Sequence, residues 1–268
     1  MNSKKRPLIL ITNDDGVHSP GLLAAARSVI DLGETWVVAP RTQQSGSGRS
    51  FPPRKFEIQE TMLDVDGVFL RALAMDTSPA QAVRNGLLRF LPRLPDLAIA
   101  GINYGENIGG TVTISGTIGA AIEAASFGIP TLAAALETEK KYHMSISPEV
   151  DFRTASGFVR RISRWILEHG MPPAVDILKL DVPWGAGPDT PLRVTRVSRQ
   201  PYWVSPVITD SEGQRHLEGY MRHVERETLE PDSDVHAIAV DHVVSLSPLT
   251  IDLTAPVSLS DLVNLLNL

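Results

Sequence analysis

The sequence predicts an α/β fold in which a mainly parallel sheet is covered by helices on both faces. Short aliphatic runs alternate with segments of helical periodicity along the first two thirds of the chain. These runs are apolar at consecutive positions, which is typical of parallel strands buried on both faces. Polar and glycine-rich clusters follow several of the runs, and ligands in such folds bind at the carboxyl ends of the strands.

The strands are predicted from aliphatic runs bounded by turn residues. Buried strands are expected at residues 8–12, 35–40, 96–103, 131–136 and 176–183. Residues 56–60 and 68–75 are expected to pair as a hairpin, because Asp66-Gly67 between them is a common two-residue turn.

Each helix is predicted from a start signal and an apolar stripe. Ser19-Pro20 and Ser78-Pro79 each offer a capping hydroxyl followed by a proline, which favours the first helical turn. Ser115 is expected to begin a third helix. Apolar spacing over residues 152–166 predicts a fourth, which ends near Gly170.

The sequence pattern changes after about Trp184, where helical periodicity gives way to strand-like runs. Strand-like runs fill residues 192–253, including 236–253, and helical periodicity returns only in the final segment SLSDLVNLLNL. We therefore expect an α/β core at residues 1–185, a β-rich hairpin extension at 186–254 and a C-terminal helix at 255–268. Long β ribbons seldom stand alone, so the extension predicts association between copies of the chain.

Composition and charge exclude several classes of protein. The 268 residues contain no cysteine, which excludes disulfides, thiolate nucleophiles and cysteine-based zinc sites. The net charge is -6, and residues 201–268 hold 3 basic and 11 acidic side chains, which would repel a polymeric nucleic acid. The apolar runs are too short for a signal peptide or a membrane span. A cytoplasmic protein without a nucleic-acid or membrane partner is expected.

The segment ILITNDDGVHSPGL ends a buried strand in two adjacent carboxylates, Asp14 and Asp15. Two such anions repel each other, and their desolvation is costly unless something pairs with them. They either cap the next helix in a solvated loop or hold a divalent cation. Hard oxygen ligands favour magnesium, manganese or calcium. His18 lies close by in sequence and is a weaker candidate for proton transfer.

The later glycine-rich clusters offer groups for both a cation and an anion. Asn103 and Asn107 in GINYGENIGG carry amide oxygens for a hard cation and amide nitrogens that donate to phosphate. Ser115-Gly116-Thr117 begins a helix whose N–H groups and dipole favour phosphate, and the SGSG loop presents further N–H groups. Asn, Ser and Gly are also ordinary turn residues, so each motif alone has a purely structural reading.

Several known motifs are missing from the sequence. No Gly-Lys-Ser/Thr occurs at P-loop spacing, no GxGxxG follows the first strand, and no GxSxG nucleophile elbow occurs. His236 and His242 are expected to be surface or packing residues. Three arginines of one loop would steer an anionic substrate or form a solvated loop face: Arg41, Arg49 and Arg54.

Five segments occur together in one order: ITNDDGVHSPGL, VVAPRTQQSGSGRS, DLAIAGINYGENIG, SGTIGAAIEAASFGIP and SPLTIDLT. In combination they resemble the survival protein SurE family, closely over residues 8–135 and more weakly over 234–254. The chain departs from the resembling sequences at Ile114, Asp181 and Asp241-His242, where those sequences carry Tyr, Asn and Gly-Tyr.

The resemblance implies a Rossmann-like three-layer core and a metal-dependent nucleotidase that hydrolyses nucleoside 5′- or 3′-monophosphates. It also implies a homodimer or homotetramer that exchanges the β-hairpin. One Mn²⁺ or Mg²⁺ per subunit would be held by Asp14, Asp15, Ser45 and Asn103. The implied catalytic set is Asp14, Asp15, Asn107 and Ser115. The implied substrate-binding set is Asn13, Gly46, Asn107, Ser115, Gly116 and Thr117.

Two mechanisms and two other classes of function stay open. Either a metal-bound water attacks phosphorus, or one aspartate attacks it to form an aspartyl-phosphate. A nucleotide-sugar-dependent transferase and a non-catalytic nucleotide-binding module are the alternative functions on the same fold. The intact set of metal ligands favours the hydrolase.

Overall fold

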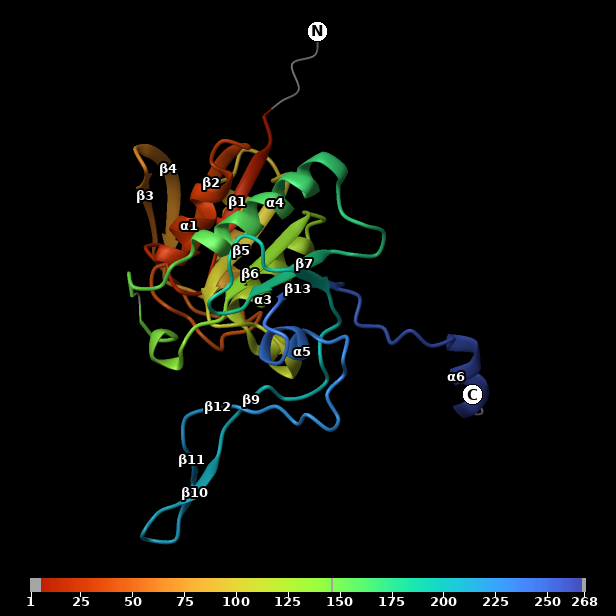
Figure 1. Cartoon of the computed structure of the whole chain (residues 1–268). Helices are drawn as coiled ribbons and strands as arrows, with labels where there is room; N and C mark the ends of the chain where they lie inside the picture. The colour runs from red at the N-terminus through yellow and green to blue at the C-terminus, as the bar shows by residue number, and fades with distance from the viewer. Residues whose placement is uncertain (1–5, 146, 267–268) are drawn as a thin grey trace.

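The computed structural model describes residues 6–145 and 147–266 and confirms the predicted α/β fold, with helices on both faces of one large sheet (Figure 1). Residues 1–5 of the predicted core and residues 267–268 of the predicted C-terminal helix lie outside the described residues, as does residue 146.

The elements follow the predicted alternation. The main sheet contains β1 (Leu8–Thr12), β2 (Glu34–Pro40), β3 (Ile58–Val65), β4 (Val68–Met75), β5 (Leu97–Tyr104), β6 (Thr131–Leu136), β7 (Ile177–Val182), β8 (Leu192–Val194) and β13 (Val244–Leu249). The helices are α1 (Pro20–Val29), α2 (Pro79–Arg89), α3 (Gly116–Ala125), α4 (Arg153–His169), α5 (Asp234–Ala239) and α6 (Leu259–Leu266), with 3-10 turns η1 (Gly109–Ile114) and η2 (Lys140–Tyr142). Four short strands complete the set: β9 (Trp203–Val204), β10 (Val207–Thr209), β11 (Arg215–Leu217) and β12 (Met221–Arg222).

The sheet has the order β3-β4-β2-β1-β5-β6-β7-β13-β8. Strands β4, β2, β1, β5, β6 and β7 run parallel, whereas β3 is antiparallel to β4 and β13 is antiparallel to β7. From β1 the chain passes to β2 on one side, and β5 pairs with β1 on the other. This reversal beside β1 is where ligands bind in open α/β sheets.

The predicted start and turn signals are confirmed. The hydroxyls of Ser19, Ser78 and Ser115 each accept a backbone N–H of the first turn at 3.2 Å. The hairpin of β3 and β4 turns at Asp66-Gly67, where both residues have positive φ, 53° and 84°, as a type I′ turn requires.

The core lies in two apolar layers, one on each face of the sheet. Ile9 and Ile11 of β1 pack in the layer that contains α1 and α4, and Leu10 packs in the layer that contains α2 and α3. Successive side chains of a strand point to opposite faces. The continuous apolar run of β1 therefore serves both layers and brings its polar end, residues 13–15, to the middle of the sheet edge.

The prediction of strand over residues 236–253 is wrong in its first part. The structure places Asp234–Ala239 in helix α5, and β13 begins only at Val244. The Ser233 hydroxyl accepts the His236 N–H and caps this helix, so a local cap outweighs the β-like composition. Strands β8 and β13 join the main sheet, while β10 and β11 form the hairpin that projects from the body (Figure 1).

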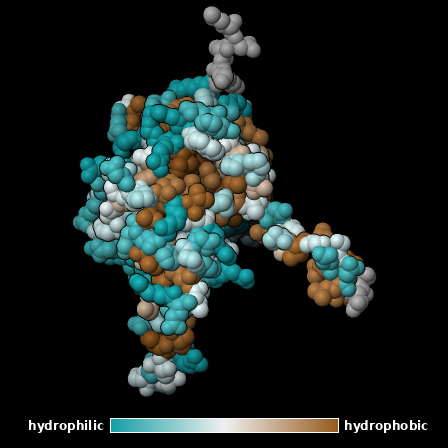
Figure 2. Space-filling view, turned by 45° about the vertical axis from the view of Figure 1, so that its right-hand side comes forward, coloured by the Kyte–Doolittle hydropathy of each residue, from teal (hydrophilic) through white to brown (hydrophobic). Residues whose placement is uncertain are grey.

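Helix α6 stands apart from the body at the end of an extended segment (Figures 1 and 2). Apolar side chains cover much of it in Figure 2, and Leu259, Leu265 and Leu266 are each more than half exposed. An apolar surface of this kind is typical of a contact with another molecule. No described helix is long and apolar enough to cross a membrane.

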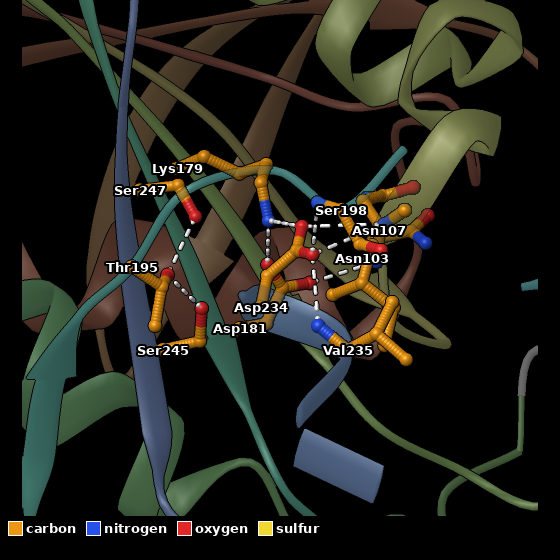
Figure 3. A network of polar contacts seen from close by, with 12 residues as sticks. Asn103, Asn107, Lys179, Asp181, Thr195, Ser198, Asp234, Val235, Ser245 and Ser247 are labelled. Atoms are coloured by element: carbon orange, nitrogen blue, oxygen red, sulfur yellow. Dashed lines mark hydrogen bonds and ion pairs between the residues drawn. The ribbon is translucent and has the colours of Figure 1, made fainter. Parts of the chain in front are cut away.

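A buried ion cluster ties the C-terminal segment to the sheet (Figure 3). The Lys179 ammonium of β7 lies 2.6 Å from an Asp181 oxygen and 3.1 Å from an Asp234 oxygen, and the three side chains are almost completely buried. Burial alone would lower the pKa of Lys179, but the two carboxylates outweigh it, and the pKa lies above its ordinary value. Lys179 therefore stays charged in the core.

The same cluster fixes three stretches of backbone. Asp181 accepts the Asn107 N–H at 2.7 Å, and Asp234 accepts the N–H groups of Ser198 at 2.9 Å and Gly109 at 3.2 Å. The loop after β5, the entry to the extension and the start of α5 thus depend on one set of charges (Figure 3).

Replacing Lys179 by methionine is expected to lower the free energy of unfolding by about 3–5 kcal/mol, because two buried carboxylates lose the one cation that pairs with them among the described residues. Urea denaturation measures this change. The control is Lys141→Met, which removes an exposed, solvent-screened ion pair with Glu139 and is expected to leave the free energy of unfolding almost unchanged. Equal losses in the two variants would contradict the role assigned to the cluster.

Candidate active site

The structure brings the polar clusters predicted from the sequence to one cavity. Its volume is 470 Å³, and it opens at the carboxyl ends of β1, β2 and β5, beside the start of α3. Six of the predicted site residues line it: Asp14, Ser45, Gly46, Asn103, Asn107 and Ser115. Asp15, Gly116 and Thr117 lie directly behind this lining, in contacts described below.

Asp14 and Asp15 are buried side by side, and the described groups that donate hydrogen bonds to them are neutral. The Thr117 hydroxyl donates a short hydrogen bond to Asp14. Asp15 accepts from the Tyr104 N–H at 3.3 Å and from the Gln43 amide at 3.2 Å. Within the described residues, no Lys, Arg or His side chain forms an ion pair with either carboxylate. These hydrogen bonds therefore fix the orientation of the two carboxylates, but no described residue neutralises their charge.

The electrostatics of the pair follow from this lack of counter-charge. Burial raises the pKa of Asp14 from 3.8 to about 6, although hydrogen bonds from Thr117 oppose the change. Burial, followed by the negative charge of Asp14, raises the pKa of Asp15 well above 3.8. A bound cation would remove both penalties, because it favours the ionised carboxylates.

The donors around the carboxylates fit a hard divalent cation. The Asn103 amide nitrogen donates to the Gly105 carbonyl at 2.7 Å, which leaves its amide oxygen as a ligand. Gln43 donates to the Ser45 hydroxyl at 3.0 Å as well as to Asp15, so it holds two of the four predicted ligands together. The described residues contain no group of three or more His, Cys, Asp and Glu side chains placed for a metal. The other oxygens near the two carboxylates belong to neutral groups, the Ser45 hydroxyl and the Asn103 amide, and oxygens of this kind would suit Mg²⁺ or Mn²⁺.

Gly116 is required by the close approach of the helix start to Asp14. A Cβ at this position would lie 2.7 Å from an Asp14 carboxylate oxygen and 2.9 Å from the Ser47 hydroxyl. That Ser47 hydroxyl is buried and has no hydrogen-bond partner among the described residues. The α3 N-terminus, the Ser47 hydroxyl and Asp14 are thus packed closely together, and the positive end of the α3 dipole lies beside the Asp14 carboxylate.

Some predicted residues lie outside the cavity lining. The Asn13 side chain bonds Gly16 and Ser19 within its own turn. His18 is exposed and does not line the cavity. The three arginines of the loop after β2 do not line it either, and two of them pair with carboxylates elsewhere: Arg41 with Glu57 and Arg49 with Glu123.

Other residues of the site carry no sequence signal. Gln43 is one of two adjacent glutamines in a polar loop, and only the structure shows which of them reaches Asp15. Glu106 lines the cavity beside Asn107, and burial raises its pKa to about 7 despite its ion pair with Arg222. Three aromatic lining residues come from distant segments: His143, Trp203 and Tyr220.

The chain matches known proteins over almost its whole length. The family model described as Survival protein SurE matches residues 9–204. A protein named 5′-nucleotidase SurE from Methanothrix thermoacetophila is 42% identical over 96% of this chain and 98% of its own. Its namesake from Thermococcus kodakarensis is 39% identical over 94% of this chain and 96% of its own.

A solved structure agrees with these relatives. The SurE protein from Aquifex aeolicus superposes with a TM-score of 0.78 at 27% identity and covers 97% of this chain and 99% of its own. The fold, the order of the motifs and the full-length similarity lead to one assignment. The chain belongs to the survival protein SurE family.

Proposed function

We propose that this chain is a divalent-metal-dependent nucleotidase that hydrolyses nucleoside 5′-monophosphates to nucleoside and phosphate. The observation that carries the proposal is the buried pair Asp14 and Asp15, which forms no ion pair with a described residue and lies beside a helix start that suits phosphate. The name 5′-nucleotidase SurE of relatives near 40% identity supports the same reaction. We propose that nucleoside 3′-monophosphates are substrates as well, as the resemblance to the SurE family implies.

In the proposed site Asp14, Asp15, Ser45 and Asn103 hold one Mn²⁺ or Mg²⁺. Such an ion polarises phosphoryl oxygens and lowers the pKa of a bound water. Thr117 and Gln43 orient the two carboxylates through their hydrogen bonds. An orienting contact of this kind fixes the ligand atoms before the ion binds.

The remaining proposed roles concern the phosphate. The first N–H groups of α3, after Ser115, point out of the N-terminus of the helix, which is the end that stabilises an anion. Gly46 and Asn107 line the same cavity, and the Asn107 backbone is fixed by Asp181. These donors are held in place before reaction, so they stabilise charge that develops on the transferring group. Both water attack and attack by an aspartate are compatible with this arrangement.

We also propose that the protein works as a homo-oligomer. The exposed apolar side chains of α6 and the projecting β10–β11 hairpin support an association that covers them (Figure 2). A dimer and a tetramer are equally compatible with these surfaces.

Phosphate release from adenosine 5′-monophosphate is expected only when Mn²⁺ or Mg²⁺ is returned to chelator-treated protein. Asp14→Asn is expected to lower kcat/KM about a hundredfold or more, as loss of a preorganised electrostatic group does. The matched control is Asp189→Asn, an exposed carboxylate outside the cavity. Folded wild-type protein that releases no phosphate with either metal would favour a binding module over an enzyme.

Added Mn²⁺ is expected to raise the Tm more at about pH 8 than at about pH 5. Burial raises the pKa of Asp14 to about 6, so the metal-free native state binds more protons than the unfolded chain between about pH 4 and 6 and loses stability as the pH rises. The cation competes with those protons and stabilises the ionised pair. Thermal denaturation with chelator or Mn²⁺ measures the difference, and an equal Tm gain at both pH values would contradict the proposed ligands.

Gly116→Ala is expected to weaken Mn²⁺ binding about tenfold, because the new methyl group displaces Asp14. Calorimetric titration with Mn²⁺ measures the affinity. In the control Gly157→Ala, nothing outside its own helix lies within 4 Å of the added Cβ. That variant should bind Mn²⁺ as wild type does and gain about 0.5–1 kcal/mol of stability. Unchanged affinity in Gly116→Ala would show that the close approach has no bearing on the metal.

A further inference from the structure

The wall of the active-site cavity is polar near the carboxylates and largely apolar and aromatic away from them. Beside the polar residues and Tyr104 of β5, the wall carries three more aromatic side chains, His143, Trp203 and Tyr220, and two other apolar ones, Ile114 and Met144. Ile114 and Met144 are both more than half exposed. A group of apolar side chains exposed in a cavity is typical of a ligand contact and is costly for a surface without a partner.

The aromatic residues form one packed cluster. The rings of His143 and Tyr220 stack at 6.0 Å with an interplanar angle of 12°. The Trp203 ring meets both of them edge-on at 5.3 Å. A Cβ on Gly105 would lie 2.8 Å from the His143 ring, so the cluster abuts the loop that follows β5 and carries Asn107. The cluster and the phosphate-binding groups therefore belong to one site.

The β-rich extension supplies two of the three rings. Trp203 lies on β9, and Tyr220 directly precedes β12, the strand that pairs with β9. Arg222 of β12 fastens this ribbon to the core through Glu106 at 3.0 Å and Glu137 at 2.9 Å. The cavity is thus completed by a segment far from the metal-binding motifs in sequence.

The charges at this end of the cavity argue against a second phosphate. None of the described residues that line the cavity is a Lys or an Arg. Two nearby cations already bind protein groups. Arg222 forms ion pairs with the two glutamates, and Lys140 donates a hydrogen bond to the Tyr220 carbonyl at 2.7 Å. An uncharged flat ring suits this wall, whereas a diphosphate does not.

The size and continuity of the cavity fit one nucleotide. Its 470 Å³ falls within the range of about 300–1,000 Å³ for small-molecule sites. Ile114 is the residue directly before Ser115, so the apolar wall begins one residue from the proposed phosphate-binding helix start.

We propose that Trp203, Tyr220 and His143, together with Ile114 and Met144, form the subsite for the nucleobase of the substrate. The inference rests on the proposed nucleotidase function and names the part of the substrate that gives selectivity. Stacking on aromatic side chains tolerates every base, because every base has a π face. The subsite therefore selects nucleotides over phosphate esters without a base and discriminates weakly among bases.

The test compares adenosine 5′-monophosphate with ribose 5-phosphate, which shares the phosphate and the sugar but lacks the base. In wild-type protein kcat/KM is expected to be at least about tenfold higher for the nucleotide. Trp203→Leu and Ile114→Ala should each lower this ratio several-fold to about tenfold, whatever loss the two substrates share. The control Trp165→Leu removes a partly exposed tryptophan of α4 outside the cavity and should keep the wild-type ratio.

Equal kcat/KM for the two substrates in wild type, or an unchanged ratio in Trp203→Leu and Ile114→Ala, would overturn the subsite. Saturation-transfer NMR with adenosine and with ribose gives a second readout that needs no turnover. Transfer to the base protons of adenosine is expected in wild type and weakened in Trp203→Leu. If wild type hydrolyses neither ester, the nucleotidase proposal fails, and absence of transfer to adenosine separately rejects the nucleobase subsite.

Discussion

The adjacent buried carboxylates Asp14 and Asp15 are the constraint on which the site depends. They follow β1, an interior strand of a sheet that is covered on both faces, and the described groups that donate hydrogen bonds to them are neutral. A chain gains nothing for its stability from burying two anions without a counter-charge. The loops after β2 and β5 and the start of α3 all line the cavity next to this pair. The groups that offset the free-energy cost of burying the two carboxylates therefore come from several segments at this edge of the sheet.

A second set of charges, Lys179, Asp181 and Asp234, fixes the positions of the loop after β5 and of the extension relative to the sheet. Unlike the first pair, it contains its own cation, and its carboxylates accept backbone N–H groups from the loop after β5 and from the extension. The ribbon of β9 and β12 brings Trp203 and Tyr220 to the cavity. The extension therefore contributes to the site itself, in addition to any role in association.

The sequence was informative where short-range rules decide the structure. The serine caps, the Asp66-Gly67 turn and the aliphatic runs each depend on a few neighbouring residues, and the structure confirms them. The strand predicted at residues 236–239 was wrong, because the Ser233 cap and the buried ion pair of Asp234 favour a helix there. Gln43, Glu106 and the aromatic cluster could not be predicted. Their roles arise from long-range packing, which leaves no motif in a single sequence.

The central claim is that the carboxylate pair is held for a divalent cation. The most direct test is a crystal structure of the protein grown with Mn²⁺, with anomalous diffraction used to locate the ion. The account predicts one anomalous peak per chain in contact with Asp14, Asp15 and the Asn103 amide oxygen. A cavity without a peak at saturating Mn²⁺, or a peak that leaves both aspartates unliganded, would contradict it.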